Sequence, residues 1–487
     1  MPELDLPSEV GGQWSDVFDW PIIGIESILT PGGKILTYGT DQLGQQGGAL
    51  IYDVWDPATN THYTLPNKTP TDMFCSAAIV VPSTGDILIS GGDARPMGHI
   101  NMGVADVNVF DYRDMSVSAS QDGPMSYQRW YPTVVELANG KVLILGGCDM
   151  TGQGVGMPEL YTPGAGWKSL TGAYSTAIAA DWSYPRAWLA PNGKVFLFDA
   201  TSTAGNPADV LVMDPSGNGT LTKVADLPFT TAFQLPAIKF APDKVLILDD
   251  QGGAWVMDMS GDVPTFQQTG SLGEVRDWSN LVVLADGSVL VSGGSEVGNQ
   301  LVGVHNEVQI WNPQTGVWAT GNDASVARMY HSTTILLPDA TVLSLGGGAP
   351  GPLTNTNGEI YTPSYLFNAD GSLATRPVIT DSPQSIQQQQ NFTITLDDAS
   401  DITRLTFIKT GAVTHSMDMS TDMLDLGFTH GPGNTLIVTV PNNANVLAPG
   451  NWMLFAFNDE GTPSVAATIF VGIGGELFSP VFDGYVT

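Results

Sequence analysis

A hairpin pattern that recurs seven times is the feature that most constrains how this chain can fold. Each copy has an apolar run, a turn containing Asn, Asp or Gly, a second apolar run and a closing pair of small or acidic residues, as in a β-hairpin. The closing pairs begin at residues 39, 91, 146, 199, 249, 293 and 346, so neighbouring copies lie 44 to 55 residues apart. Units of this kind bury their apolar faces only by stacking on one another, which predicts a repeat architecture.

The period near 50 residues, with Gly-Gly after the second apolar run of most copies, is typical of kelch repeats, in which each copy forms one four-stranded propeller blade. We therefore expect a seven-bladed kelch-type β-propeller over residues 1–375. The copies are LTPGGKILTYG (29–39), VPSTGDILISGG (81–92), LANGKVLILGG (137–147), APNGKVFLFDA (190–200), APDKVLILDD (241–250), LADGSVLVSGG (284–294) and LPDATVLSLGG (337–347).

The repeat stops after Arg376-Pro377, and the remaining residues alternate short apolar runs with turns at the spacing of a β-sandwich. We expect an immunoglobulin-like domain over residues 376–487. Its predicted strands include FTITL, RLTFIKT, NTLIVTV, NWMLFAF and AATIFVG. The chain also has 56 glycines, 33 prolines and only 14% charged residues, a composition that disfavours long helices. The predicted fold class is therefore all-β throughout.

The chain is strongly acidic, with 17 Lys and Arg against 49 Asp and Glu and a formal net charge of −32. Such a surface repels nucleic acid and anionic membranes, and no apolar run approaches the ~18 residues of a transmembrane helix. The first residues, MPELDLPSEVGGQW, lack the basic and apolar regions of a signal peptide. We expect a secreted or extracytoplasmic monomer from which a leader or a neighbouring domain has been removed.

One register position of the repeat carries unusual side chains. The first strand of each blade lines the propeller axis, so residues at a fixed distance before the hairpin turn form a ring around the central channel. Counting back nine positions, with one insertion allowed in the second copy, gives aromatic, imidazole or thiol groups in five copies: Cys75, Tyr131, Tyr184, Trp278 and His331. A structural ring would carry valine or isoleucine, so this concentration indicates a metal or binding site at one mouth.

The chain has two cysteines, Cys75 and Cys148, too few for a disulfide framework and too far apart in sequence for a zinc site. A disulfide between them is one alternative. Cys148 and Asp149 follow a Gly-Gly pair, so both are expected near the same mouth as the ring.

Six motifs together resemble the copper radical oxidases, the family that includes galactose oxidase and glyoxal oxidase. They are FCSAA (74–78), RWYPT (129–133), MYHST (329–333), ATRPVIT (374–380), GAVTHS (411–416) and PGNWMLFAFNDEGTPSVAATIFV (449–471). Each is a modest match alone, but their order and separations make the set specific. The FCS and RWYPT motifs are more similar to glyoxal oxidase.

The resemblance implies one copper ion held by Tyr131, Tyr330, His331 and His415, with a thioether bond joining Cys75 to the ring of Tyr131. Tyr131 would be the equatorial phenolate and radical carrier, and Tyr330 the axial phenolate and proton acceptor. Cu(II) favours such nitrogen and oxygen ligands. Oxidising an alcohol or aldehyde removes two electrons, and the sequence has no flavin or nicotinamide motif to store the second one.

The implied activity is oxidation of small glyoxal-type aldehydes or primary alcohols, with O2 reduced to H2O2. The residues expected to flank the substrate are Arg129, Trp130, Asp149, Arg276 and Trp278, whereas Tyr184 is expected to be packing. Where galactose oxidase stacks a tryptophan on the cross-link, this chain has Cys148-Asp149. Two alternatives stay open: an alcohol oxidase of the galactose oxidase type that acts on a carbohydrate, and a non-catalytic kelch module that binds glycan or protein.

Overall fold

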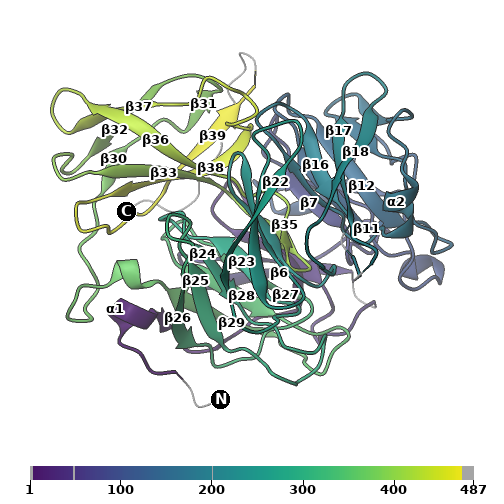
Figure 1. The fold of residues 1–487 in the computed structure, drawn as a ribbon, viewed down its shortest axis with the longest axis horizontal. Helices are drawn as coiled ribbons and strands as arrows, with labels where there is room; N and C mark the ends of the chain where they lie inside the picture. The colour runs from purple at the N-terminus through teal and green to yellow at the C-terminus, as the bar shows by residue number, and fades with distance from the viewer. Residues whose placement is uncertain (1–3, 48–49, 200, 204, 474–487) are drawn as a thin grey trace.

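The computed structural model describes residues 4–47, 50–199, 201–203 and 205–473. In this part of the chain nearly all regular structure is β, as Figure 1 shows, and the all-β prediction is confirmed. The helical segments are short: α1 (Ser8–Gly11), α2 (Thr176–Ala180), η1 (Arg95–Met97) and η2 (Ser364–Leu366). None of the described helices has the length and apolar character needed to cross a membrane.

The larger part of the molecule is a β-propeller, and five of its antiparallel sheets are separate blades. Four of them have four strands and the fifth has five. Their strands are β7 (Ala77–Val80), β8 (Ile87–Ser90), β9 (Val107–Asp111) and β10 (Ser116–Ala119); β11 (Trp130–Glu136), β12 (Val142–Cys148), β13 (Glu159–Thr162) and β14 (Gly166–Ser169); β15 (Arg186–Leu189), β16 (Val195–Phe198), β17 (Asp209–Asp214) and β18 (Thr220–Asp226); β23 (Asn280–Val283), β24 (Val289–Ser292), β25 (Glu307–Trp311) and β26 (Trp318–Asp323); and β27 (Ser332–Leu336), β28 (Val342–Gly346) and β29 (Asn357–Thr362) with β1 (Gln13–Trp14) and β2 (Phe18–Asp19).

Two further four-stranded antiparallel groups form the ends of one ten-stranded sheet. They are β3 (Gly24–Leu29), β4 (Ile35–Gly39), β5 (Ile51–Asp56) and β6 (Thr61–Pro66), and β19 (Ala237–Ala241), β20 (Lys244–Leu248), β21 (Gly253–Asp258) and β22 (Thr265–Ser271). A hairpin from later in the chain, β34 (Ala412–Thr414) and β35 (Met417–Asp418), lies between the groups. β34 pairs with β3, and β35 pairs with β19.

Each of the seven predicted hairpins is the connection between the first two strands of one group. These two strands are almost entirely buried in every group, which explains why they read as near-continuous apolar runs. The outer strands alternate more, as in β18 and β22, because one of their faces meets solvent. The N-terminal strands complete the last group, with Gln13 opposite Thr362 and Phe18 opposite Gly358.

The C-terminal part forms a separate sheet of eight strands, seen at the upper left of Figure 1. Its strands are β30 (Ile379–Asp381), β31 (Ser385–Gln387), β32 (Phe392–Leu396), β33 (Arg404–Lys409), β36 (Met423–His430), β37 (Thr435–Thr439), β38 (Gly450–Phe457) and β39 (Ala467–Gly472). The five strands predicted from the sequence are β32, β33, β37, β38 and β39. This sheet curls around an apolar core of its own, which includes Phe407, Leu436 and Trp452.

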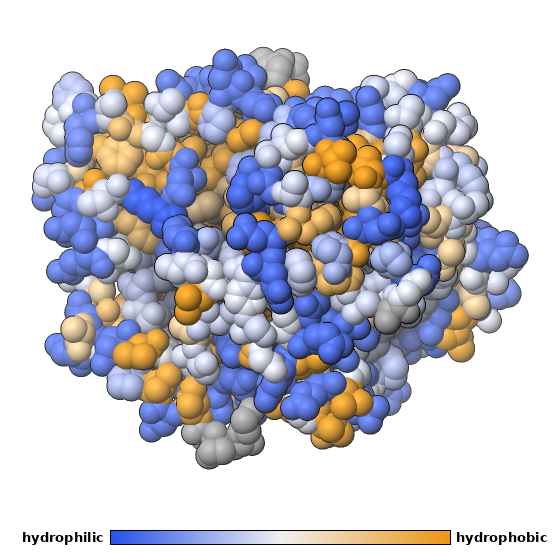
Figure 2. All heavy atoms as spheres, in the orientation of Figure 1, coloured by the Kyte–Doolittle hydropathy of each residue, from blue (hydrophilic) through white to orange (hydrophobic). Residues whose placement is uncertain are grey.

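Two buried ion pairs join the C-terminal segment to the propeller. Lys409 of β33 contacts Glu136 of β11, and Lys239 of β19 lies 2.7 Å from Asp422. These four side chains are at most 6% exposed. By contrast, hydrophilic residues are spread over much of the face seen in Figure 2. A buried charge that loses its partner is strongly destabilising, so these pairs fix how the two parts sit together.

Replacing Lys409 by Met is expected to lower the free energy of unfolding by about 3 kcal/mol near pH 8, because Glu136 is left buried without its counter-charge. Burial already raises the pKa of Glu136 to about 7, even with Lys409 beside it. Without Lys409 this pKa rises further, so between the unfolded and folded pKa values the folded variant binds more protons than the unfolded chain. The stability of the variant therefore falls as the pH rises through this window.

Denaturant unfolding near pH 5 and near pH 8 measures this effect. Lys68→Met, at an exposed lysine, is the matched control and should change little at either pH. If Lys409→Met lost the same free energy of unfolding at both pH values, the charge of Glu136 would not be the cause.

Candidate metal centre

The five ring residues share an unusual backbone conformation. All are non-glycine residues in the left-handed region, with φ of 56° at Cys75, 66° at Tyr131, 45° at Tyr184, 64° at Trp278 and 66° at His331. This region is costly for residues with a Cβ atom and persists where surrounding structure enforces it. Backbone hydrogen bonds link the positions between blades, since the Tyr131 amide donates to the Cys75 carbonyl and the Tyr184 amide to the Tyr131 carbonyl. The ring predicted from the register is therefore a real structural feature.

Two imidazoles face each other within the propeller. His331 comes from the start of β27, and His415 comes from the turn between β34 and β35. Their Nε2 atoms lie 2.9 Å apart. The Nδ1 of His331 donates to the Gly348 carbonyl at 2.7 Å, and the Nδ1 of His415 lies 2.6 Å from the Thr414 hydroxyl. Because Nδ1 of His331 carries the proton, its Nε2 lone pair is directed at the space shared with His415.

Both imidazoles are kept neutral by their surroundings. Burial lowers the pKa of His331 to about 3, and burial together with the neighbouring His331 lowers the pKa of His415 well below its usual value. Each side chain is only 1% exposed. Neutral imidazole is the form that binds metal ions.

Two phenols complete the arrangement. The hydroxyl groups of Tyr131 and Tyr330 are in hydrogen-bond contact, although the residues lie 199 positions apart in sequence. The ring of Tyr330 stacks on His331 at a centroid distance of 3.7 Å, and the ring of Tyr131 lies 4.6 Å from that of His415. Burial raises the pKa of both tyrosines. A phenolate at this depth therefore requires a cation beside it.

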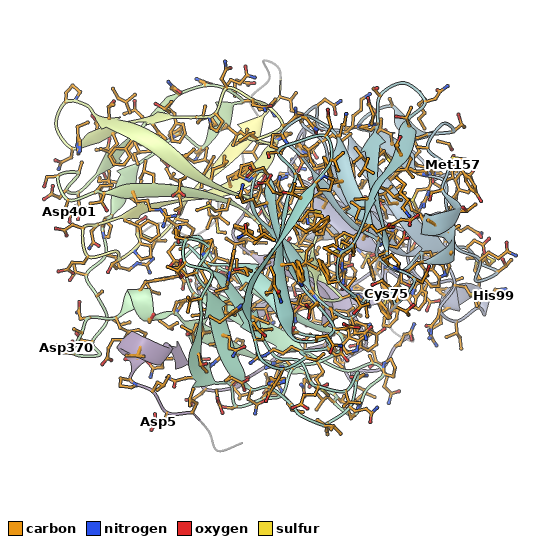
Figure 3. All side chains as sticks on the ribbon, viewed as in Figure 1. Asp5, Cys75, His99, Met157, Asp370 and Asp401 are labelled. Atoms are coloured by element: carbon orange, nitrogen blue, oxygen red, sulfur yellow. The ribbon has the colours of Figure 1, made fainter. Side chains whose placement is uncertain are left out.

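Cys75 lies at the same point. Its Sγ is 3.5 Å from Nε2 of His415 and 3.7 Å from Nε2 of His331. In Figure 3, Cys75 lies among the propeller strands, well inside the outline of the molecule. Burial raises its pKa, while a hydrogen bond with Tyr131 acts in the opposite direction. Cys75 and Cys148 are both free thiols, which removes the alternative of a disulfide between them.

The donor set fits copper. Two neutral imidazole nitrogens and two phenol oxygens converge from separate parts of the chain, and Cu(II) prefers nitrogen and oxygen ligands in tetragonal geometry. The Cys75, His331 and His415 donor atoms all lie within 4.8 Å of one another. A carboxylate cage, which calcium or magnesium would need, is not found among the described residues around these histidines.

Two of the predicted substrate contacts, Arg129 and Arg276, are instead buried within blades. Arg129 is 3.0 Å from Glu159 and donates to the carbonyls of Gly146 and Met157, and Arg276 pairs with Glu307. Both guanidinium groups are engaged inside the fold, because a buried arginine must satisfy its donors. A substrate contact by these two residues finds no support in their placement.

Asp149 is also occupied by its own turn. Its Oδ1 accepts hydrogen bonds from the Thr151 amide and hydroxyl and from the Gln153 amide, an Asx-type turn. Asp149 therefore shapes the loop after β12. The position noted above as replacing a stacked tryptophan thus carries a turn residue.

Trp130 and Trp278, the two aromatic residues expected to flank the substrate, lie beside the phenols. The Trp130 ring is 4.0 Å from Tyr131, and the Trp278 ring is 4.3 Å from Tyr330. Two further aromatic residues near them were not predicted. Trp182 lies 6.2 Å from Tyr131, and Phe233 lies 5.1 Å from Trp278. Both come from loops between blades, outside the repeated hairpins, so the repeat register could not reveal them.

Comparison with known proteins also points to copper oxidases. Residues 376–471 match the family model described as "Galactose oxidase-like, Early set domain". A galactose oxidase of Gibberella zeae is 31% identical, over 94% of this chain and 70% of the relative. An aldehyde oxidase, GLOX, of Vitis pseudoreticulata is 26% identical, over 84% of this chain and 83% of the relative.

A solved structure shares the fold across nearly the whole length. It is described as a novel fungal alcohol oxidase with catalytic diversity among the AA5 family, in complex with copper. It superimposes with a TM-score of 0.83 at 24% identity, covering 95% of this chain and 99% of that one.

The sequence motifs suggested greater likeness to glyoxal oxidase, but over the whole chain the identity to the galactose oxidase is higher than that to the aldehyde oxidase. The convergent imidazoles, phenols and thiol agree with either relative. This chain belongs to the galactose oxidase family of copper radical oxidases and is a copper-dependent oxidase.

Proposed function

We propose that this protein oxidises primary alcohols to aldehydes and reduces O2 to H2O2. Two electrons and two protons leave the CH2OH group, and the same number reach O2, so the reaction balances without another cosubstrate. The observation that carries the proposal is the meeting of two imidazoles, two phenols and one thiol at a single buried point. Small aldehydes of the glyoxal type are the second candidate, which the FCS and RWYPT motifs favour.

The proposed copper ligands are Tyr131, Tyr330, His331 and His415. Copper would supply a one-electron acceptor and the positive charge that stabilises a phenolate. The hydrogen bond from His331 to Gly348 orients one imidazole, and contact with Thr414 orients the other.

The second one-electron store is proposed to be Tyr131, joined to Cys75 by a thioether. Forming this bond removes one hydrogen from the thiol and one from the phenol ring, and the two electrons require an oxidant such as O2. Sulfur on the ring makes the phenolate easier to oxidise. The thiol of Cys75 and the side chain of Tyr131 are hydrogen-bonded neighbours in one buried cluster, which supports this assignment.

Two residues of the chain then act on the alcohol. Tyr330 is partly exposed, unlike Tyr131, so it is the phenol that an incoming hydroxyl group reaches first. We assign Tyr330 as the acceptor of the hydroxyl proton. The proton would pass along a short hydrogen bond between the alcohol and the phenol oxygen of Tyr330. Tyr131, as a radical, would take the hydrogen atom from the adjacent carbon. Its 4% exposure keeps water from quenching the radical.

For the architecture we propose seven blades. The two groups at the ends of the ten-stranded sheet, β3–β6 and β19–β22, each have the strand order of the separate blades. Adding them to the five separate blades gives the kelch count expected from the sequence. We place the domain border between residues 375 and 376, where the match to the family model begins. A secreted monomer is the proposed state of the protein.

The first test is made on copper-loaded wild-type protein. Its intact mass should be lower than the sequence mass by the two hydrogens of the thioether, and iodoacetamide should modify Cys148 but not Cys75 after denaturation and reduction. Peroxide release is then measured with glycerol, galactose, benzyl alcohol and methylglyoxal. A full sequence mass together with no peroxide from any compound would refute the proposed function. Peroxide from methylglyoxal alone would select the aldehyde candidate.

Cys75→Ser and Tyr131→Phe are expected to abolish peroxide release, because each removes one partner of the cross-link. The fold should persist, since both changes remove few atoms. Tyr184→Phe is the matched control: it also removes one hydroxyl from a fully buried ring tyrosine, whose hydroxyl donates to the Ser76 carbonyl. Peroxide release and circular dichroism are measured for all three variants. Substantial turnover by Tyr131→Phe would exclude Tyr131 as the radical carrier.

A further inference from the structure

Four aromatic side chains surround the two phenols, and the proposed chemistry itself does not need them. We call Trp130, Trp182, Phe233 and Trp278 the aromatic rim. Trp130 and Trp182 lie next to Tyr131 and are 6.0 Å from each other. Phe233 and Trp278 lie on the side of Tyr330 and meet edge to face, at an interplanar angle of 83°. The reacting phenols are thus flanked by indole and phenyl rings on two sides.

Three of the four rim members reach solvent, whereas the two histidines of the proposed metal site do not. Trp130, Trp182 and Phe233 are partly exposed, whereas His331 and His415 are buried. A molecule that approaches Tyr330 therefore meets aromatic faces.

The cationic groups of this region are not free to bind a substrate. Besides Arg129 and Arg276, Arg328 lies 3.3 Å from Glu359, and Arg186 donates to the carbonyls of Phe233 and Leu235. Arginine is the usual partner of carboxylate and phosphate groups, and none of these four can serve that purpose. The nearby exposed charges, Glu274 and Glu296, are negative.

Exposed apolar side chains occur at the same end of the propeller as the aromatic rim. Leu43, Met97, Ile100, Leu301 and Val302 are 73%, 55%, 58%, 55% and 50% exposed. They lie in the loops that follow β4, β8 and β24. The ends of these strands pair with the starts of the first strands, as in Ala77 opposite Ser90 and Asn280 opposite Ser292. The loops therefore lie at the same end of the propeller as the ring residues.

We propose that the aromatic rim binds an uncharged substrate whose primary alcohol, or aldehyde, is attached to an aromatic ring. The proposal rests on the function proposed above and specifies its substrate class. Aromatic rings pack edge to face or offset at centroid distances of 4.5 to 7 Å, and rim members already pack on each other in this way. A ring packed on Phe233 and Trp278 would lie on the side of Tyr330, toward which its CH2OH group would point. An anionic substrate would find none of the four arginines described above free and would be repelled by the acidic surface.

Peroxide release from the copper-loaded protein is compared for benzyl alcohol, cyclohexylmethanol and galactose. The value of kcat/KM for benzyl alcohol should exceed that for galactose by at least about tenfold, and that for cyclohexylmethanol should be lower than for benzyl alcohol because it lacks π faces. Preference for galactose would overturn the proposal, and so would equal values for benzyl alcohol and cyclohexylmethanol.

Variants test the residues. Trp182→Leu and Phe233→Leu should each lower kcat/KM for benzyl alcohol by about fivefold, chiefly by raising KM, and change the value for glycerol by less than about twofold. Trp182→Phe, which keeps an aromatic ring, should retain most of the wild-type kcat/KM for benzyl alcohol. Tyr174→Leu, at an aromatic residue 56% exposed in the preceding loop, is the control and should change neither value. Equal losses of kcat/KM for glycerol and benzyl alcohol would mean that the aromatic rim supports the fold and does not bind the substrate ring.

A binding measurement separates this proposal from the proposed function. Copper-loaded Cys75→Ser cannot turn over, so calorimetry on it reports binding alone. Benzyl alcohol should bind, galactose should bind at least about tenfold more weakly, and Trp182→Leu in this background should weaken only benzyl alcohol. Wild-type protein with the thioether and with peroxide release, but without benzyl alcohol binding, would overturn the substrate class alone. A full sequence mass together with no peroxide from any compound would overturn the proposed function, whichever compound binds.

Discussion

The structure depends on the pairing of the β34–β35 hairpin with two propeller strands. This hairpin contributes hydrogen bonds to β3 on one side and to β19 on the other, so it lies between two groups that are far apart in sequence. Backbone pairing is directional, and it fixes the depth of the hairpin as well as its position. His415, at the turn of the hairpin, is thereby held at 2.9 Å from His331. Ion pairs at the base of the hairpin, Lys409 with Glu136 and Lys239 with Asp422, hold the segment on which it stands.

The ring residues show how a repeat can build a site. A kelch-like repeat places one residue of each first strand at the same height around the axis, and the blades here hold these residues in the left-handed region. The scaffold beneath them is uniform: Arg129 with Glu159, Arg276 with Glu307 and Arg328 with Glu359 are buried pairs with sequence separations of 30, 31 and 31 residues. The backbone conformation is thus repeated, while the side chain at the ring position differs from blade to blade.

Much of this could be predicted from the sequence, for identifiable reasons. The hairpins were visible because both strands are buried and the turns carry Asn, Asp or Gly, and the ring followed from counting along them. His415 could not be found by counting, since it lies outside the repeat, and only the resemblance to a family indicated it. The sequence could not show that Arg129 and Arg276 are paired inside the fold, because their glutamate partners lie on other strands of the same blade. Trp182 and Phe233 lie in irregular loops, where no period marks a position.

The place of His415 in the chain has a consequence for the order of assembly. Cys75, Tyr131, Tyr330 and His331 belong to the propeller and leave the ribosome first, whereas His415 follows about 80 residues after His331. The strands to which the hairpin pairs, β3 and β19, are made before the hairpin itself. A nascent chain therefore lacks one of the proposed metal ligands throughout propeller synthesis. Under the proposed function, the metal site is complete only after the segment that carries His415 has been made, when Tyr131 is already enclosed by the propeller.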